Sequence, residues 1–582
     1  MMFHRFFRKT SGRHLAGSVV VAVVLALLTL YVGLRFYSTS PLNIWENTAV
    51  YRTGYIPQKN GDSVVFLSVG KVILDGGMPY RDVFDHKGPL LYLVEVFGLW
   101  LGGLYGVWFF ELLALGGSLF FLYRTARLFT GRATACLAVC VAALGTVDLL
   151  RGGNFTETYA LPFQAATLCV FTRFLKQDFT LSRMSAFRVG AEFGAVFLLR
   201  PNITGIWILF CVVLLITSLV RRNYAFLFSR TGFFLAGAAT LAVPILVWLG
   251  IGGAMTDFVW QFWIYNVDYS SLATWERFFS TLRYFAGLSY FIPLAAAIYV
   301  FLAMRPSAAF PRGMTFLFAT NFLLGLCLAA MPGRQDTHYL ISLVVGWFPA
   351  LVWVTERLTE SLTRIGQRKR AVLFAAFYAF LLLFPIWPVL EKMEYHDFQL
   401  YRLRLREAAS PLVDPQTDEI IRWVCDRLDP TDTLAGYGEN SIARILFYSG
   451  RPSASKYIYC PSLAPPIEEN PFFRDLLDTL KKSEPDCFIR EKRFLSEFDV
   501  TYGTRSFFPG ELRDWLGARD YHKVYENEGF EIYVRGKRPG GIGSFGACPD
   551  SGPEREPPVK SPDEGFYRGF RRKGSSQEFS GG

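Results

Sequence analysis

Two neighbouring pieces of the chain decide how it is read: Asp62-Ser63-Val64 and Gly77-Met78-Pro79-Tyr80-Arg81-Asp82-Val83-Phe84-Asp85-His86-Lys87-Gly88-Pro89-Leu90. They crowd acids, bases, a histidine and turn-forming residues into a segment between apolar stretches. A loop that only joined two membrane spans would not need so many ionisable groups. On the outer face of a membrane, this segment is the first place to look for chemistry.

The composition is that of a polytopic α-helical membrane protein. Of 582 residues, 52% are hydrophobic and 19% charged, and the mean hydropathy is +0.26. These values do not fit a soluble globular protein of this length. About eleven apolar runs approach the roughly 20 residues that cross a bilayer. The predicted spans are Leu15–Leu34, Tyr105–Leu122, Ala133–Leu150, Tyr159–Phe174, Arg183–Leu199, Ile203–Val220, Phe233–Ile251, Tyr284–Met304, Met314–Ala330, Tyr339–Val354 and Ala371–Leu390.

Basic residues orient these spans, because Lys and Arg in short loops stay on the cytoplasmic side. The N-terminus carries Arg5, Arg8, Lys9 and Arg13, so residues 1–14 are expected in the cytoplasm, followed by an uncleaved signal anchor rather than a cleaved signal peptide. Every later basic cluster then falls inside. The first outer loop (37–104) and everything after Leu390 fall outside, which predicts a cell (inner) membrane protein with an extracytoplasmic C-terminal part. The apolar segment Leu90–Leu104 is expected to lie along the outer interface.

The net charge of +11 follows from this positive-inside bias and does not indicate nucleic-acid binding. The nine cysteines and six histidines are scattered, without the spacing of a zinc site.

The chain after the last span divides in two. Residues 391–536 are expected to form a soluble α/β domain, and the Gly-, Pro- and Ser-rich tail 537–582 is expected to be disordered. The domain's predicted helices are Asp418–Leu428, Ser441–Tyr448 and Pro471–Lys481. Its predicted strands are Thr433–Tyr437, Tyr457–Tyr459, Cys487–Arg490 and a terminal hairpin of Lys523–Tyr525 and Phe530–Val534.

Asp62 is the candidate catalytic residue. It precedes the apolar-patterned Val64–Leu74, so its simplest role is a helix N-cap. Its functional role would be a general base that takes a proton from an acceptor hydroxyl during group transfer. The two roles are compatible, because a carboxylate fixed at a helix start can still face a cavity.

Four of the residues that follow Pro79, namely Asp82, Asp85, His86 and Lys87, are candidate substrate contacts. Lys87 or His86 would bind a phosphate, and Asp82 or Asp85 would bind sugar hydroxyls. The simpler alternative is a turn held by local ion pairs.

Other outer loops add candidates at span ends. Asn154–Glu157 begins with a glycosylation sequon and ends on Glu157, a second carboxylate for the site. Arg200 is expected to form a buried ion pair or to bind an anionic ligand. The alternative is that its side chain extends to the membrane surface and keeps its charge in water. Arg334 and His338 would hold a lipid phosphate or anchor a helix end. Glu111, inside a span, is expected to pair with another helix.

At these residues the chain resembles the GT-C superfamily of membrane glycosyltransferases, in particular the bacterial protein O-mannosyltransferase and aminoarabinose transferase branch (glycosyltransferase family 39-like). The resemblance rests on Asp62 early in the first outer loop, on Gly77-x-Pro79-Tyr80-x-Asp82 and on Asp85-x-Lys87-x-Pro89-Leu90. Asn154–Phe163, Arg200-Pro201-Asn202 and Gly333-Arg334…His338-Tyr339 are similar to further motifs of the group. It covers roughly residues 15–390.

Membership would imply a sugar carried on polyprenyl phosphate, an acceptor in the cell envelope (glycan, lipid or protein), and inverting transfer with Asp62 as base. Lys87 or Arg334 would then neutralise the departing lipid phosphate. Many relatives place a second acid directly after the first, where this chain has Ser63. This difference weakens a metal-binding role and leaves Glu157 or Asp82 as the second carboxylate, so no cofactor is expected to be required, and the sequence does not support a divalent metal. The alternatives are a lipid or glycan transporter, which would predict repeats and mid-span charges, and a non-catalytic envelope assembly protein.

Overall fold

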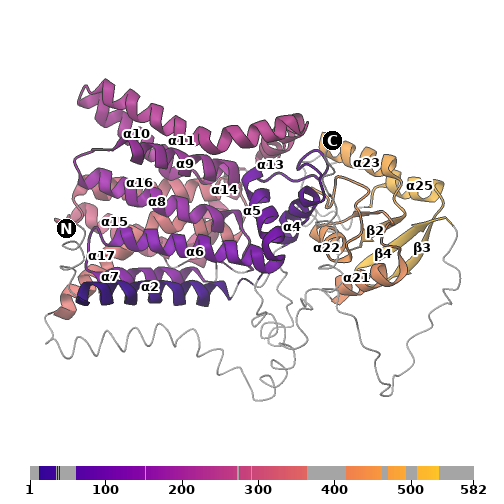
Figure 1. The fold of residues 1–582 in the computed structure, drawn as a ribbon, viewed down its shortest axis with the longest axis horizontal. Helices are drawn as coiled ribbons and strands as arrows, with labels where there is room; N and C mark the ends of the chain where they lie inside the picture. The colour runs from indigo at the N-terminus through magenta and orange to yellow at the C-terminus, as the bar shows by residue number, and fades with distance from the viewer. Residues whose placement is uncertain are drawn as a thin grey trace, which may run out of the picture.

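The computed structural model describes residues 12–34, 36, 39, 61–147, 149–150, 152–271, 274–289, 291–363, 415–461, 469–492 and 508–536. These residues form a helical part and, beside it, a smaller part with a β-sheet (Figure 1). The predicted span Ala371–Leu390 and the tail 537–582 lie outside the described residues.

The regular elements that the structure describes before residue 364 are all helices. Their bounds are α2 (Gly12–Gly33), α4 (Gly61–Leu74), α5 (Pro89–Gly102), α6 (Leu104–Ala126), α7 (Arg132–Thr146), α8 (Thr156–Lys176), α9 (Arg183–Leu199), η1 (Pro201–Ile203), α10 (Gly205–Val220), α11 (Tyr224–Ile251), α12 (Met255–Phe258), η2 (Val259–Tyr265), α13 (Asn266–Ser271), α14 (Trp275–Leu288), α15 (Phe291–Met304), α16 (Arg312–Ala330), η3 (Thr337–Leu343) and α17 (Val344–Thr363).

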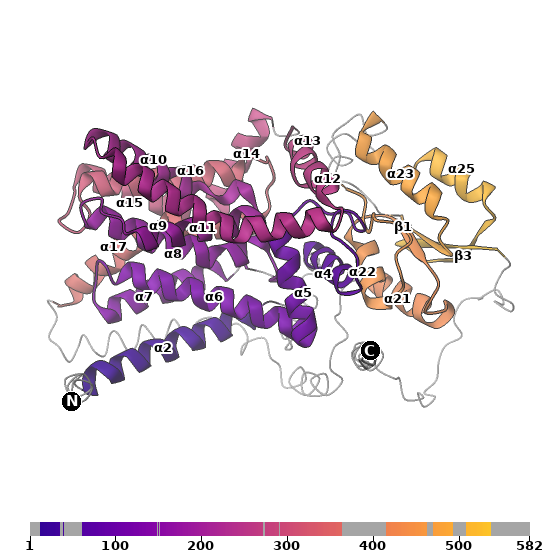
Figure 2. The ribbon, with the colours of Figure 1, turned by 45° about the horizontal axis from the view of Figure 1, so that its top comes forward.

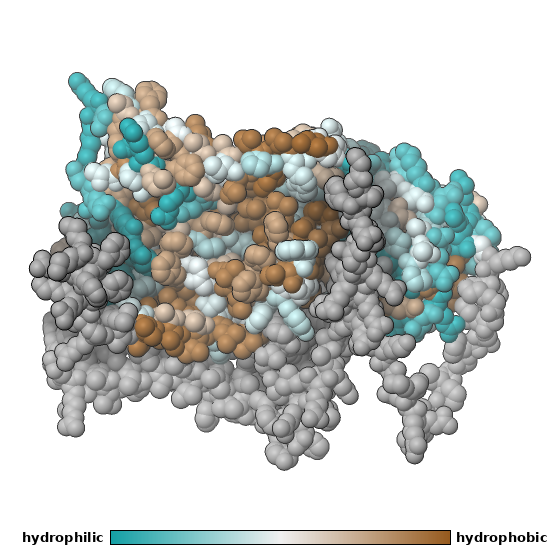
Figure 3. Space-filling model, in the orientation of Figure 1, coloured by the Kyte–Doolittle hydropathy of each residue, from teal (hydrophilic) through white to brown (hydrophobic). Residues whose placement is uncertain are grey.

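The helical part is that of a multi-pass membrane protein. Among the described residues, α6, α11, α16 and the run Thr337–Ser361 are long and apolar enough to cross a bilayer. Large apolar side chains of α11, such as Phe228, Val247 and Ile251, are exposed on its surface. Figure 3 shows apolar surface over the helices and hydrophilic surface over the sheet-containing part. Such an apolar surface is typical of contact with lipid.

One predicted span is not a continuous helix. Tyr284–Met304 was expected to be continuous, but α14 and α15 are bent by 91° relative to each other. Pro293 explains the start of the second helix: it lies in the first turn of α15, where its missing N–H costs no hydrogen bond. The count of about eleven spans stays a prediction, because several described helices are shorter than a full crossing.

Where the structure describes it, from residue 61 on, the predicted first outer loop contains α4 and α5. At 14 residues, α5 is about 21 Å long, shorter than the hydrocarbon core. It folds back on α6 through Gly103, and the two backbones touch: a Cβ on Gly106 would lie 2.0 Å from the Gly98 carbonyl oxygen. Small residues at both positions therefore allow this close turn.

The C-terminal part is a small α/β unit. Its elements are α21 (Pro415–Arg427), β1 (Leu434–Tyr437), α22 (Asn440–Ser449), α23 (Pro471–Ser483), β2 (Cys487–Glu491), α25 (Gly510–Ala518), β3 (Tyr521–Glu526) and β4 (Phe530–Arg535). The sheet order is β1-β2-β4-β3, with β1 parallel to β2 and the other pairs antiparallel. Tyr457–Tyr459, expected to be a strand, is not one: its side chains pack on the first outer loop. The helix α25 was not predicted.

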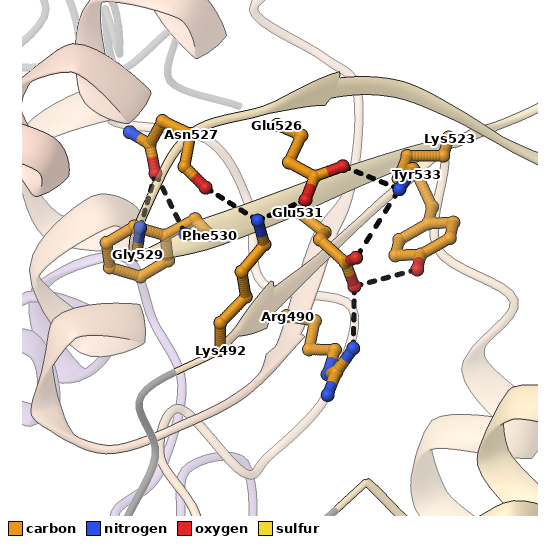
Figure 4. Close-up of polar contacts among 9 residues, drawn as sticks. All are labelled: Arg490, Lys492, Lys523, Glu526, Asn527, Gly529, Phe530, Glu531 and Tyr533. Carbon is orange, nitrogen blue, oxygen red and sulfur yellow. Dashed lines mark hydrogen bonds and ion pairs between the residues drawn. The ribbon is translucent and has the colours of Figure 1, made fainter. Parts of the chain in front are cut away.

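A polar network fixes the hairpin of β3 and β4 (Figure 4). The Asn527 side-chain oxygen accepts the N–H groups of Gly529 (2.9 Å) and Phe530 (2.8 Å). Lys492, just after β2, pairs with Glu526 and donates to the Asn527 carbonyl at 2.7 Å. An asparagine that bonds its own backbone is a common way to start a tight turn.

The α/β unit docks directly on the first outer loop. Figures 1 and 2 show α22 beside α4 in both views. The N–H of Phe84 donates to the Lys456 carbonyl at 2.7 Å, and the Phe84 ring stacks on the Tyr457 ring with centroids 4.8 Å apart. Phe472 of α23 packs against Trp260 and Tyr265 of η2. The candidate site lies at this junction.

Candidate active site

A strained turn presents the charged segment after Pro79. Tyr80 has a φ of 70°, which is unusual for a residue with a bulky side chain. Its N–H donates to the Val83 carbonyl (2.9 Å), and its hydroxyl donates to the Lys87 carbonyl (2.7 Å). Gln261 of η2 donates to the Tyr80 carbonyl at 2.6 Å. These bonds on both sides hold the turn in one conformation.

Gly88 brings this turn against the end of α9. Its N–H donates to the Leu199 carbonyl at 3.1 Å, and a Cβ there would lie 1.9 Å from the Leu198 carbonyl oxygen. Only glycine permits this approach without moving the backbone. As a result Lys87 and Arg200, 113 positions apart in the chain, face the same region.

Asp85 is buried, with both oxygens occupied. Tyr92 of α5 donates to one oxygen at 2.8 Å, and Tyr459 of the α/β unit donates to the other at 2.9 Å. The Asp85 N–H donates to Gln261 at 3.2 Å. Burial raises the pKa of Asp85, while Lys87 and the tyrosine hydroxyls act in the opposite direction. The carboxyl supports the turn, and its role in binding sugar hydroxyls stays a prediction.

His86 lies between Asp85 and Lys87. Its Nδ1 is 3.4 Å from Asp85 Oδ1, and its Nε2 is 2.9 Å from Lys87 Nζ. A lysine ammonium can only donate, so Nε2 accepts and the proton of the neutral ring is on Nδ1, toward Asp85. Burial and the cations Lys87, Arg200 and Arg334 lower the pKa of His86 well below 6.5.

Lys87 joins the turn to the other candidates. Burial lowers its pKa, the carboxylate of Asp62 opposes this most, and Arg200, Asp85 and Glu157 also act on it. Asp62, half-buried, lies in the first turn of α4 rather than before it. An acid there is favoured by the helix dipole, and among the acids it acts most strongly on the Lys87 ammonium.

Arg200 forms the opposite side of the site, at the end of α9. Its guanidinium pairs with the buried Glu157 in the first turn of α8, and its Nε donates to Asn202 at 2.9 Å. The same guanidinium lies 4.2 Å from the centre of the Tyr339 ring. The structure thus shows a buried pair, which was one of the three expectations for this arginine.

Arg334 and His338 complete the cluster. The His338 ring stacks on Phe155, with centroids 4.5 Å apart and planes 10° apart. His338 acts electrostatically on Glu157, and Arg334 acts on His86 and Tyr265. Seven predicted residues are therefore brought together: Asp62, His86, Lys87, Glu157, Arg200, Arg334 and His338. Their roles stay predictions.

The contacts of Asp82 lie within its own turn. Its carboxylate accepts from Arg81 (2.7 and 2.8 Å) and from the Met78 N–H (2.7 Å), and it is exposed. Arg81 lowers the pKa of Asp82 through this contact. These contacts match the simpler alternative of a turn held by local ion pairs.

Asn154 is a site residue whose role the sequence did not disclose. It has a φ of 55°, its Nδ2 donates to Ser63 at 2.9 Å, and its Oδ1 accepts from Tyr159 at 2.8 Å. Its N–H donates to Glu111, which supplies the missing partner of that buried acid. Because Asn154 is fully buried and bonded at both ends, the sequon it opens is not accessible in the folded chain.

Among the described residues, no group of three or more His, Cys, Asp or Glu side chains has the geometry of a metal site. The arrangement instead joins a half-buried carboxylate, Asp62, to several cations. Such a set can bind an anionic group and accept a proton beside it.

Comparison with known proteins shows that the fold carrying this site also occurs in solved structures. The family model "Putative competence-induced protein Ccs4 N-terminal domain" matches residues 55–387, more than half of the chain. No protein of curated function matches. ArnT from Cupriavidus metallidurans bound to undecaprenyl phosphate superimposes with a TM-score of 0.51 at 14% identity, over 89% of this chain and 98% of that one.

The same enzyme in its apo state gives a TM-score of 0.50 at 15% identity, with equal coverage. The archaeal oligosaccharyltransferase AglB from Archaeoglobus fulgidus gives 0.44 at 13% identity, over 89% of this chain and 74% of that one. The helical part has the GT-C fold, as the sequence motifs predicted. The chain belongs to the family of the putative competence-induced protein Ccs4 N-terminal domain, and it shares the fold of ArnT.

Proposed function

We propose that this protein is a glycosyltransferase that moves a sugar from a polyprenyl-phosphate donor to a cell-envelope acceptor on the outer face of the membrane. The observation that carries the proposal is the packing of Gly88 against the end of α9, which brings Lys87 to the same region as Arg200, where Asp62 and Arg334 also act on this turn. The similarly folded ArnT binds undecaprenyl phosphate, which supports a lipid-phosphate ligand of this kind.

The orientation is supported by the distribution of charge along the helices. Glu157 opens α8, and Lys176 closes it about 30 Å away. At that far end Lys176 donates to the Leu128 carbonyl (2.6 Å), and Arg221 pairs with Asp178 (2.6 Å). Basic residues gather at the end opposite the site, as the positive-inside rule requires if the site is outside. Nucleotide sugars do not reach that face, so the donor has to be carried by a lipid.

In the proposed reaction, Asp62 takes the proton of an acceptor hydroxyl as its oxygen attacks the anomeric carbon of the sugar. The bond from that carbon to the phosphate oxygen breaks, and its electron pair leaves on the polyprenyl phosphate. Attack opposite the leaving group inverts the anomeric centre. Lys87 and Arg334 stabilise the negative charge that develops on the departing phosphate, and Glu157 fixes Arg200 beside it.

The test is transfer by the purified protein in nanodiscs, offered a panel of polyprenyl-phosphate sugars and extracted envelope acceptors. Asp62→Asn keeps the shape of the side chain but removes the base, so transfer should fall by at least about 100-fold. Binding of the donor should persist.

Asp75→Asn is the matched control. Asp75 follows the same helix and pairs with Lys71 at 3.0 Å on an exposed surface, so this variant should transfer normally. Full activity of Asp62→Asn would refute the assignment of the base. Absence of transfer by the wild type with every donor would instead favour a transporter or an assembly protein.

A further inference from the structure

The α/β unit contributes a side chain to the site of the membrane domain. Its segment Lys456–Tyr459 covers the charged turn: the Lys456 carbonyl receives the Phe84 N–H, and the rings of Tyr457 and Tyr459 lie 4.8 and 5.9 Å from that of Phe84. The two tyrosines share this packing. Their hydroxyl groups, however, reach different partners.

The Tyr459 hydroxyl reaches into the site. It is buried, donates to Asp85 Oδ1 at 2.9 Å and lies 3.5 Å from Nδ1 of His86. The Tyr457 hydroxyl instead donates to Asp475 within the α/β unit at 2.6 Å. Asp62, the proposed base, also acts electrostatically on the Tyr459 hydroxyl.

A continuous set of contacts leads from this hydroxyl to Lys87. Tyr459 and Tyr92 fix the carboxylate of Asp85, and Asp85 faces the Nδ1–H of His86. The opposite nitrogen of the ring accepts from Lys87 Nζ at 2.9 Å. If the Asp85 carboxylate loses one of its two hydrogen-bond donors, the orientation of the carboxylate is no longer fixed. The orientation of the His86 ring, which accepts the hydrogen bond from Lys87, is then no longer fixed either.

We infer that Tyr459 is a positioning residue of the transferase site: through Asp85 and His86 it holds Lys87 toward the phosphate of the lipid donor. This inference rests on the proposed function. It gives the C-terminal unit a task within the active site, since the membrane domain alone lacks one of the two hydroxyls on Asp85.

The test compares Tyr459→Phe with Tyr457→Phe in the full-length protein. Both variants lose one hydroxyl and keep a ring against Phe84. Binding of undecaprenyl phosphate and of undecaprenol, the same lipid without phosphate, is measured in nanodiscs. Tyr459→Phe should weaken binding of the phosphate by about tenfold, which is the loss of one hydrogen bond to a charged group. It should leave undecaprenol binding unchanged, and Tyr457→Phe should change neither.

A double-mutant cycle separates positioning from general stability. In a Lys87→Met background, Tyr459→Phe should cause no further loss of phosphate binding, because it acts through Lys87. Four outcomes would overturn the inference while the proposed function stands. Two concern affinity alone: additive losses in the double mutant, or wild-type binding by Tyr459→Phe. The other two indicate general destabilisation: equal weakening of binding for both lipids, or a drop in unfolding temperature large enough to explain the weaker phosphate binding. If the wild type itself does not prefer undecaprenyl phosphate to undecaprenol, the proposed function fails and the inference fails with it.

Discussion

His86 shows how strongly single residues of the site depend on their neighbours. The imidazole is enclosed by the Tyr265 ring, the Asp85 carboxylate, Lys87 and the more distant Arg200 and Arg334. Burial and three cations disfavour the imidazolium more than one carboxylate favours it. A neutral ring at physiological pH can accept from Lys87, which a protonated ring could not.

This protonation state predicts a pH dependence. Because the pKa of His86 is below 6.5 in the folded protein, the unfolded chain binds a proton that the folded chain does not when the pH falls below about 6.5. The stability advantage of the wild type over His86→Asn should therefore shrink as pH falls from 7.5 to 5.5. Asp85 is present in both the wild type and the variant, so the comparison isolates the contribution of His86. Thermal unfolding in detergent at several pH values measures this, and an advantage that grows toward low pH would contradict it.

At the scale of elements, two buried acids on neighbouring helices differ in their partners. Glu111 of α6 accepts from the N–H of Asn154 and the hydroxyl of Thr39. Glu95 of α5 is equally buried, but neither of its oxygens makes a hydrogen bond of standard geometry among the described residues, although the Asn154 side chain lies near it. A buried polar group stabilises a fold only when it is bonded.

The same substitution at both positions should therefore have opposite effects. Glu111→Met leaves the buried Asn154 N–H without an acceptor and should lower the free energy of unfolding by about 1–3 kcal/mol. Glu95→Met replaces an unbonded carboxyl by an apolar chain of similar length and should leave stability equal or higher. The unfolding temperatures of the two variants in one detergent provide the measurement. An equal loss in both would show that Glu95 has a partner of its own.

For the whole molecule, apolar runs and basic clusters predicted the helical architecture because both follow directly from the bilayer. Predicted span ends such as Arg183–Leu199 coincide with the observed helix. The bend between α14 and α15 was missed because both halves are apolar around it. The contact of Tyr459 with Asp85 spans 374 positions and leaves no local pattern in the sequence.

The candidate site was predictable as a set of residues but not as an arrangement. Ionisable groups at the ends of apolar runs identified Lys87, Arg200 and Arg334, because charges near membrane depth are costly without a function. Their proximity depends on Gly88 lying against Leu198, which is a packing detail. The sequence alone could not distinguish a structural role for Asp85 from a substrate-binding role for Lys87. Only the fold shows that the hydroxyls of Tyr92 and Tyr459 both donate to the Asp85 carboxylate.

The central claim is that the cluster at the first outer loop binds the phosphate of a polyprenyl lipid. The most direct measurement is photolabelling of the nanodisc-embedded protein with an undecaprenyl-phosphate analogue that carries a diazirine next to its phosphate, followed by peptide mapping. We expect labels on the peptides that contain Lys87 and Arg334, abolished by excess undecaprenyl phosphate but not by undecaprenol. Labels spread along lipid-facing helices such as α11, with no protection by the phosphate lipid, would contradict the account.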